Sequence, residues 1–169
     1  MPRQRKGITK AKKPPISFRE APEVQAIAAP LISEYHPYLA EAKICYLFRT
    51  GEWESRGRKV YGAAEKVSGK YITLTGYDFV ITVGFDAWFY ADEKTRVALV
   101  DHELCHLGRG LDDKAGNPKW ITVPHMVEDF PEIIRRHGFW SAPLQRVDAA
   151  KKEHDKVVQM KLPMTGTEG

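Results

Sequence analysis

The feature that most restricts the fold of this chain is a pair of histidines four residues apart, His102 and His106. They lie in a segment, about residues 92–107, whose composition predicts a long helix with Asp92 as its N-terminal cap. Side chains at positions i and i+4 of a helix lie one turn apart on the same face, so both imidazoles point toward one place. The chain must therefore fold so that this face of the helix stays accessible.

If each residue turns the helix by about 100°, Leu99 falls on the side of the histidines, but four apolar residues of the predicted helix cluster on the opposite side. These residues are Val97, Val100, Leu104 and Leu107. The helix can therefore bury an apolar stripe in the core while it presents the histidines to a cleft. We expect Gly108 and Gly110 to stop the helix and residues 108–120, rich in glycine, aspartate and lysine, to form a loop.

The run His102-Glu103-Leu104-Cys105-His106 is typical of a catalytic zinc site. Two imidazoles one helical turn apart suit a tetrahedral zinc ion, and Glu103 is placed to hold the metal-bound water instead of the metal. Zinc lowers the pKa of such a water to ~7, and a carboxylate can then take its proton as the water attacks a polarised carbonyl. The sequence therefore predicts Zn²⁺ as the cofactor, His102 and His106 as ligands, and Glu103 as the catalytic base.

A catalytic zinc normally has three protein ligands, so a third one is needed. Asp112 stands six residues after His106, as in metzincins, but Arg109 replaces the glycine that those proteins require. His125 and Glu128 both lie where we expect the next helix to return to the first one. One of them can bind the metal while the other orients the metal-binding side chain. Imidazole is the commoner partner, which favours His125 and keeps Glu128 as the alternative ligand.

Two further polar residues belong to the same helix. Cys105 falls on the flank between the ligand face and the apolar stripe, which favours a packing role over zinc binding. Asp101 either orients a ligand or is an exposed helix carboxylate.

The rest of the chain predicts an α+β domain. Apolar residues at helical spacing predict a helix over about residues 21–35, which Pro30 should kink or divide. A further helix is expected over about 127–136, with a kink at Pro131. Three strand-like runs rich in β-branched and aromatic residues lie at 43–49, 59–67 and 79–83.

Charge divides the chain into three predicted parts. Residues 1–15 contain six basic residues and no acidic one, whereas the whole chain has a net charge of +4. We therefore expect a disordered basic tail at 1–15, a metallopeptidase domain at 16–142 and a charged C-terminal extension at 143–169. The tail is a candidate for electrostatic contact with DNA. With two cysteines, no secretory signal and no apolar stretch of membrane-spanning length, we expect a cytoplasmic protein without membrane contact.

Taken together, these motifs resemble the phage metallopeptidase family. The resemblance rests on Asp101-His102-Glu103-Leu104-Cys105-His106, Pro124-His125-Met126-Val127-Glu128-Asp129-Phe130 and Arg135-Arg136-His137-Gly138, and covers about residues 40–140. A more distant resemblance is to SprT-like peptidases, including the Spartan-type proteases that act on DNA–protein crosslinks. In those proteins a histidine is followed five residues later by phenylalanine, as His125 is by Phe130, but Met126 stands where they usually have glycine.

The resemblance implies a small zincin core of the SprT-like or minigluzincin type. Its parts would be an N-terminal helix, a short three-stranded and mainly antiparallel sheet, the active-site helix and a returning C-terminal helix. It also implies His102, His106 and His125 as ligands, Glu103 as the base, and a bacterial or phage-infected host cell as the setting. The predicted function is hydrolysis of peptide bonds in an intracellular protein substrate.

Two other functions remain open at this point. One is a nucleic-acid-associated binding protein with a structural zinc, and the other is a metal-dependent hydrolase of a non-peptide substrate. A structural zinc is normally closed by four protein ligands, so an open position beside Glu103 would argue for catalysis.

Overall fold

A computed structural model describes residues 15–125, 127 and 131–161 of the chain. The chain divides into two compact units after Val123. The predicted basic tail lies outside the described residues except for Pro15, and the predicted domain boundaries remain a prediction.

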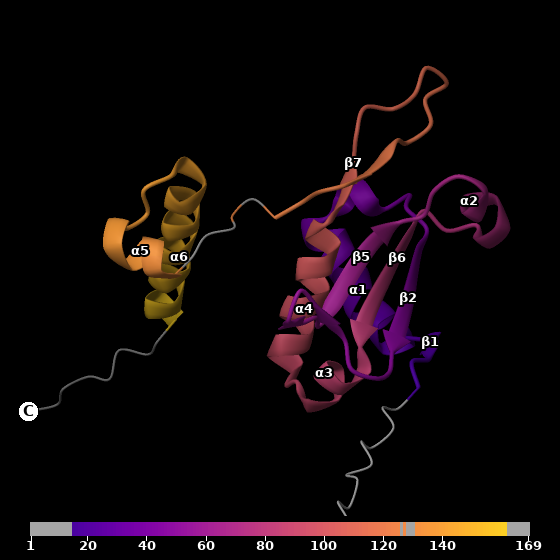
Figure 1. Ribbon diagram of the computed structural model, residues 1–169. Helices are drawn as coiled ribbons and strands as arrows, with labels where there is room; N and C mark the ends of the chain where they lie inside the picture. The colour runs from indigo at the N-terminus through magenta and orange to yellow at the C-terminus, as the bar shows by residue number, and fades with distance from the viewer. Residues whose placement is uncertain (1–14, 126, 128–130, 162–169) are drawn as a thin grey trace, which may run out of the picture. The chain divides into compact units, whose positions relative to one another are not determined.

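The first unit is built on a four-stranded mixed sheet (Figure 1). Its strands lie in the order β1 (Phe18–Glu20), β2 (Ile44–Arg49), β6 (Phe79–Gly84) and β5 (Gly62–Lys66). The β1–β2 and β5–β6 pairs are antiparallel, whereas β2 and β6 are parallel. The sequence predicted three strands and missed β1, because three exposed residues give no strand pattern.

Helices α1 (Pro22–Tyr35) and α4 (Glu93–Cys105) contact each other, and they contact β2 and β5 respectively (Figure 1). The helix predicted over residues 21–35 is confirmed, but Pro30 does not divide it. A proline removes one backbone hydrogen bond and crowds the preceding turn, at a cost of about 3 kcal/mol. Burial of Val24, Ala28 and Leu31 along the inner face of α1 offsets that cost.

Helix α4 begins where the sequence predicts. The Asp92 side chain accepts a hydrogen bond from the backbone N–H of Thr95 at 2.7 Å and so caps the helix N-terminus. The helix ends two residues earlier than predicted, at Cys105, with His106 as its C-cap. It ends there because Leu107 begins strand β7 (Leu107–Arg109).

Strand β7 pairs with β8 (Trp120–Thr122) in an antiparallel hairpin where the sequence predicted a loop over 108–120. Gly108 lies within β7 opposite Ile121, so it is not a helix stop. A Cβ at Gly108 would come within 2.9 Å of the Ile121 and Val123 side chains. The glycine therefore lets the Ile121 and Val123 side chains pack close to β7.

The core lies between the sheet and the two helices. Phe79, Ile81 and Val83 point to one face of β6 and are fully buried. Val100 and Leu104 of α4 are equally buried and Val97 is partly buried, which confirms the predicted apolar stripe within the helix. Leu107, the fourth predicted member, is buried too but belongs to β7. Each such side chain contributes about 1.5–3 kcal/mol on burial. Burial of these residues therefore holds α4 against the sheet, where it contacts the edge strand β5.

Shorter elements connect the main ones. They are the 3₁₀ helix η1 (Pro37–Leu39), the hairpin strands β3 (Glu54–Ser55) and β4 (Arg58–Lys59), α2 (Lys70–Thr75) and α3 (Phe85–Tyr90). The run predicted as one strand over 59–67 is thus divided between β4 and β5.

The second unit contains α5 (Pro131–His137) and α6 (Ala142–Lys161). Within α6, Lys151–Asp155 and Lys152–Asp148 form ion pairs of 2.6 Å across one turn. The helix predicted over 127–136 is shorter than expected: Val127 is not helical, and α5 begins at Pro131. Proline suits a first helical position, where its missing N–H has no partner to lose. No helix among the described residues is both long and apolar enough to cross a bilayer.

Candidate metal centre

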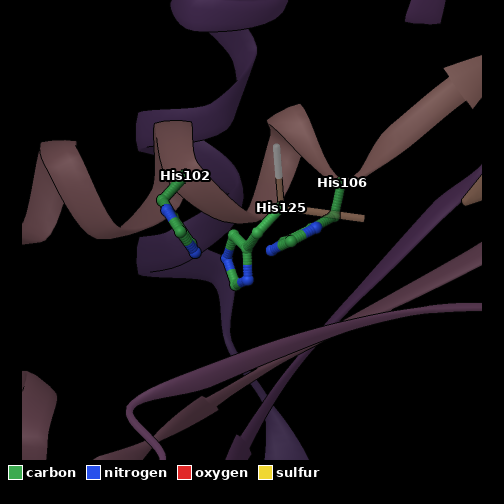
Figure 2. A group of neighbouring side chains, drawn as sticks. All are labelled: His102, His106 and His125. Atoms are coloured by element: carbon green, nitrogen blue, oxygen red, sulfur yellow. The ribbon is translucent and has the colours of Figure 1, made fainter. Parts of the chain in front are cut away.

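Three histidine side chains point toward one another beside α4 (Figure 2). One ring nitrogen from each of His102, His106 and His125 lies within 4.8 Å of the corresponding nitrogens of the other two. The rings of His102 and His106 are 5.0 Å apart and nearly perpendicular. His102 and His125 are exposed and His106 is half-buried, so the group is open to solvent. Such a group of imidazoles can hold a metal ion.

The β7–β8 hairpin orients the His106 ring. Its Nδ1 donates a hydrogen bond to the carbonyl oxygen of Val123 at 2.7 Å, and the backbone N–H of Val123 donates to the His106 carbonyl at 2.8 Å. A carbonyl only accepts, so the proton of the neutral ring is on Nδ1. The lone pair that a metal would use is then on Nε2.

His125 reaches the group from the connection that follows β8. It stands two residues after Val123, and neither His125 nor Pro124 is helical. His125 therefore lies in a non-helical connection. The bond between Val123 and His106 continues the hairpin beyond Thr122 and so directs the next residues toward the histidine pair. Glu128 and Phe130 lie outside the described residues.

Glu103 is the buried carboxyl of α4, with 4% of its surface exposed. It follows His102 directly and lies on the side of the helix that contacts β5. Burial disfavours the charged form and raises the pKa of Glu103 to about 7, although the nearby His106 lowers it in part. A carboxyl with a pKa close to neutrality can both accept and release a proton.

The sequence matches a family model described as "Putative phage metallopeptidase" over residues 16–155. The chain belongs to this family. No curated protein and no solved structure matches it. Membership supports a peptidase-type enzyme that uses a metal cofactor, and the three histidines provide candidate residues to hold one.

In this metallopeptidase-family chain, Gly62 makes room for the Glu103 carboxyl. Gly62 is the first residue of β5, and a Cβ built on it would lie 2.5 Å from Glu103 Oε1 and 2.9 Å from Cδ. No real side chain fits at such a distance, so any other residue here would displace the carboxyl. The sequence alone did not indicate a role for Gly62. The only available signal was a glycine within a strand-like run, which can mark a close approach.

We expect Gly62→Ala to lower the turnover number by ~10–100-fold with little change in KM, because the carboxyl is displaced by about an ångström. Gly62 is not among the glycines with positive φ, so alanine fits its backbone conformation and the fold should remain. Gly84→Ala is the matched control, since a Cβ there meets its nearest neighbour at an ordinary 3.4 Å. Measurement of kcat, KM and metal content tests this, and full activity of Gly62→Ala would contradict it.

Asp112, the other residue considered as a third ligand, is paired elsewhere. Arg109 donates to both of its carboxylate oxygens, from Nε at 3.1 Å and from Nη2 at 3.0 Å. A third bond, from Arg109 Nη1 to Glu41 at 2.7 Å, ties the hairpin to the segment after η1. Arg109, which replaces the glycine of metzincins, thus has a structural role here.

Proposed function

We propose that this chain is a zinc-dependent metallopeptidase that hydrolyses peptide bonds of an intracellular protein. His102, His106 and His125 are its zinc ligands and Glu103 is its catalytic base. The observation that carries the proposal is the meeting of three imidazoles beside a buried carboxyl on one helix. Membership of a metallopeptidase family supports it independently.

The donor set fits zinc. Three neutral imidazoles are the ligands of known catalytic zinc sites, which leave one position open, whereas magnesium and calcium prefer oxygen ligands. A bound zinc ion supplies Lewis acidity, which acidifies water and polarises a carbonyl oxygen. The solvent exposure of His102 and His125 supports an open site.

Glu103 is proposed to move the proton. Its carboxylate takes a proton from the attacking water and can pass it to the leaving amine nitrogen. The absence of surrounding water keeps this carboxyl protonated up to about pH 7 in the metal-free protein. A nearby metal cation would favour the carboxylate form and so ready it to accept a proton.

The proposal extends to the fold and the setting. Helix α1, the sheet and α4 support an arrangement of the SprT-like or minigluzincin type, and we propose a cytoplasmic enzyme of a bacterium or phage-infected cell. DNA contact through residues 1–15 remains a proposal from charge alone.

Removal and return of the metal tests the proposed function. A zinc chelator is expected to abolish cleavage of an unfolded protein substrate, and added zinc is expected to restore it. Cleavage that persists in the chelator would contradict the proposal. A protein that binds zinc tightly with four of its own ligands and cleaves nothing would instead be a binding protein with a structural metal.

Substitution of His125 tests the third ligand. His125→Ala is expected to weaken zinc binding by more than the ~10–100-fold that loss of a residue supporting a ligand costs, whereas Glu128→Ala should stay within that range. Competition with a chromophoric chelator measures both affinities. The reverse order would make Glu128 the ligand.

A further inference from the structure

We infer that α4 carries a second metal site, formed by His36, Asp101 and Cys105. One ligand atom from each residue lies within 4.8 Å of the other two. The site has an imidazole nitrogen, a carboxylate oxygen and a thiol sulfur as donors. It is separate from the three histidines and goes beyond the proposed peptidase activity.

The fold brings these residues together from two helices. Asp101 and Cys105 lie one turn apart on α4. Asp101 directly precedes His102, and Cys105 directly precedes His106. One residue corresponds to about 100° around a helix, so the two pairs face different directions. His36 is the C-cap of α1, and the contact between α1 and α4 places it over Asp101.

The contacts of His36 are those expected of a metal-binding imidazole. The residue is 5% exposed, and its Nε2 lies 2.7 Å from Asp101 Oδ1. Its Nδ1 lies 3.0 Å from the hydroxyl oxygen of Tyr38, a contact of the kind that orients a metal-bound imidazole. A metal would replace the proton shared by Nε2 and Oδ1, and both atoms would then bind the ion.

The thiol of Cys105 completes the set and decides the class of metal. Its side chain is exposed, so it can turn toward the buried His36 and the half-buried Asp101, and it gives the ion a path from solvent. Around a tetrahedral zinc with bonds of ~2.0–2.3 Å, two donor atoms are ~3.3–3.8 Å apart. The Nε2–Oδ1 pair, now 2.7 Å apart, would therefore open slightly, and the sulfur, within 4.8 Å of both atoms, would approach them by about an ångström at most. Sulfur and nitrogen donors select Zn²⁺, Co²⁺ or Cd²⁺ over Mg²⁺ and Ca²⁺.

This assignment differs from the packing role that the sequence suggested for Cys105. Helical position alone showed only that Cys105 was on a flank of the apolar stripe. His36, 65 residues before Asp101, supplies the partner that reveals a donor group.

Cobalt binding to the full-length, reduced protein tests the second site. Metal-free wild type titrated with Co²⁺ is expected to develop a near-ultraviolet sulfur-to-cobalt charge-transfer band, which three imidazoles cannot produce. Cys105→Ser should lose the band, and its zinc content at saturation should fall from about two ions per chain to about one. Serine at this exposed position should leave the fold intact.

Cys45→Ser is the matched control, because Cys45 lies in β2 and outside the group. It should keep the band, as should the double variant His102→Ala/His106→Ala, whose remaining ion would occupy the second site. Asp101→Asn should weaken cobalt binding at this site by ~10-fold or more. A wild-type protein without the band, or a band that survives in Cys105→Ser, would overturn the inference and leave His36–Asp101 as a hydrogen bond between helices.

Discussion

Replacement of both His102 and His106 by alanine is expected to abolish metal binding at the candidate centre and, with it, hydrolysis. The two imidazoles come from one helical turn, so the double variant removes two of three proposed ligands at once. A lone His125 on a solvent-exposed segment cannot chelate an ion. The loss should therefore be complete at micromolar protein, not a graded weakening.

The measurement is best made in a Cys105→Ser background, so that an ion at the second site is not counted. Zinc content after desalting should fall from about one per chain to near zero. His137→Ala/His154→Ala is the matched control, because it removes two histidines of the second unit that lie outside the group. About one zinc per chain in the His102→Ala/His106→Ala protein would refute the assignment of the centre.

Glu103→Gln is expected to keep the metal and lose hydrolysis by ~10² or more, the scale of general-base removal. Glutamine has nearly the shape of glutamate and fits beside Gly62, but its amide cannot accept the proton of the attacking water. Glu93→Gln, at an exposed position in the first turn of α4, is the control and should be fully active. A fully active Glu103→Gln on a verified substrate would rule out the proposed mechanism.

The same variant has a second readout in metal-free protein. The pKa of Glu103 is raised from 4.5 to about 7 by burial, so the folded protein binds this proton more tightly than the unfolded chain does. The contribution of this group to the free energy of unfolding is therefore fully present below about pH 4.5 and is lost as pH rises to about 7. Glu103→Gln should remove that decline, which denaturant unfolding at several pH values would detect.

Part of the candidate metal centre could be predicted because its residues are close together in the sequence. His102, Glu103 and His106 lie within one and a half turns of a helix, and Asp92 caps that helix through Thr95, three residues away. Helical geometry relates such residues without reference to the rest of the fold.

The sequence by itself determined helix α4, its cap, its apolar stripe and the pairing of its two histidines, because each depends on spacing along one element. Only the tertiary structure decided that Gly62 lies against Glu103, that a hairpin holds His106, and that His36 meets Asp101. These contacts join residues 17 to 65 positions apart. They exist because the buried apolar faces of the sheet and helices fix the relative positions of the elements, and one-dimensional spacing does not contain that information.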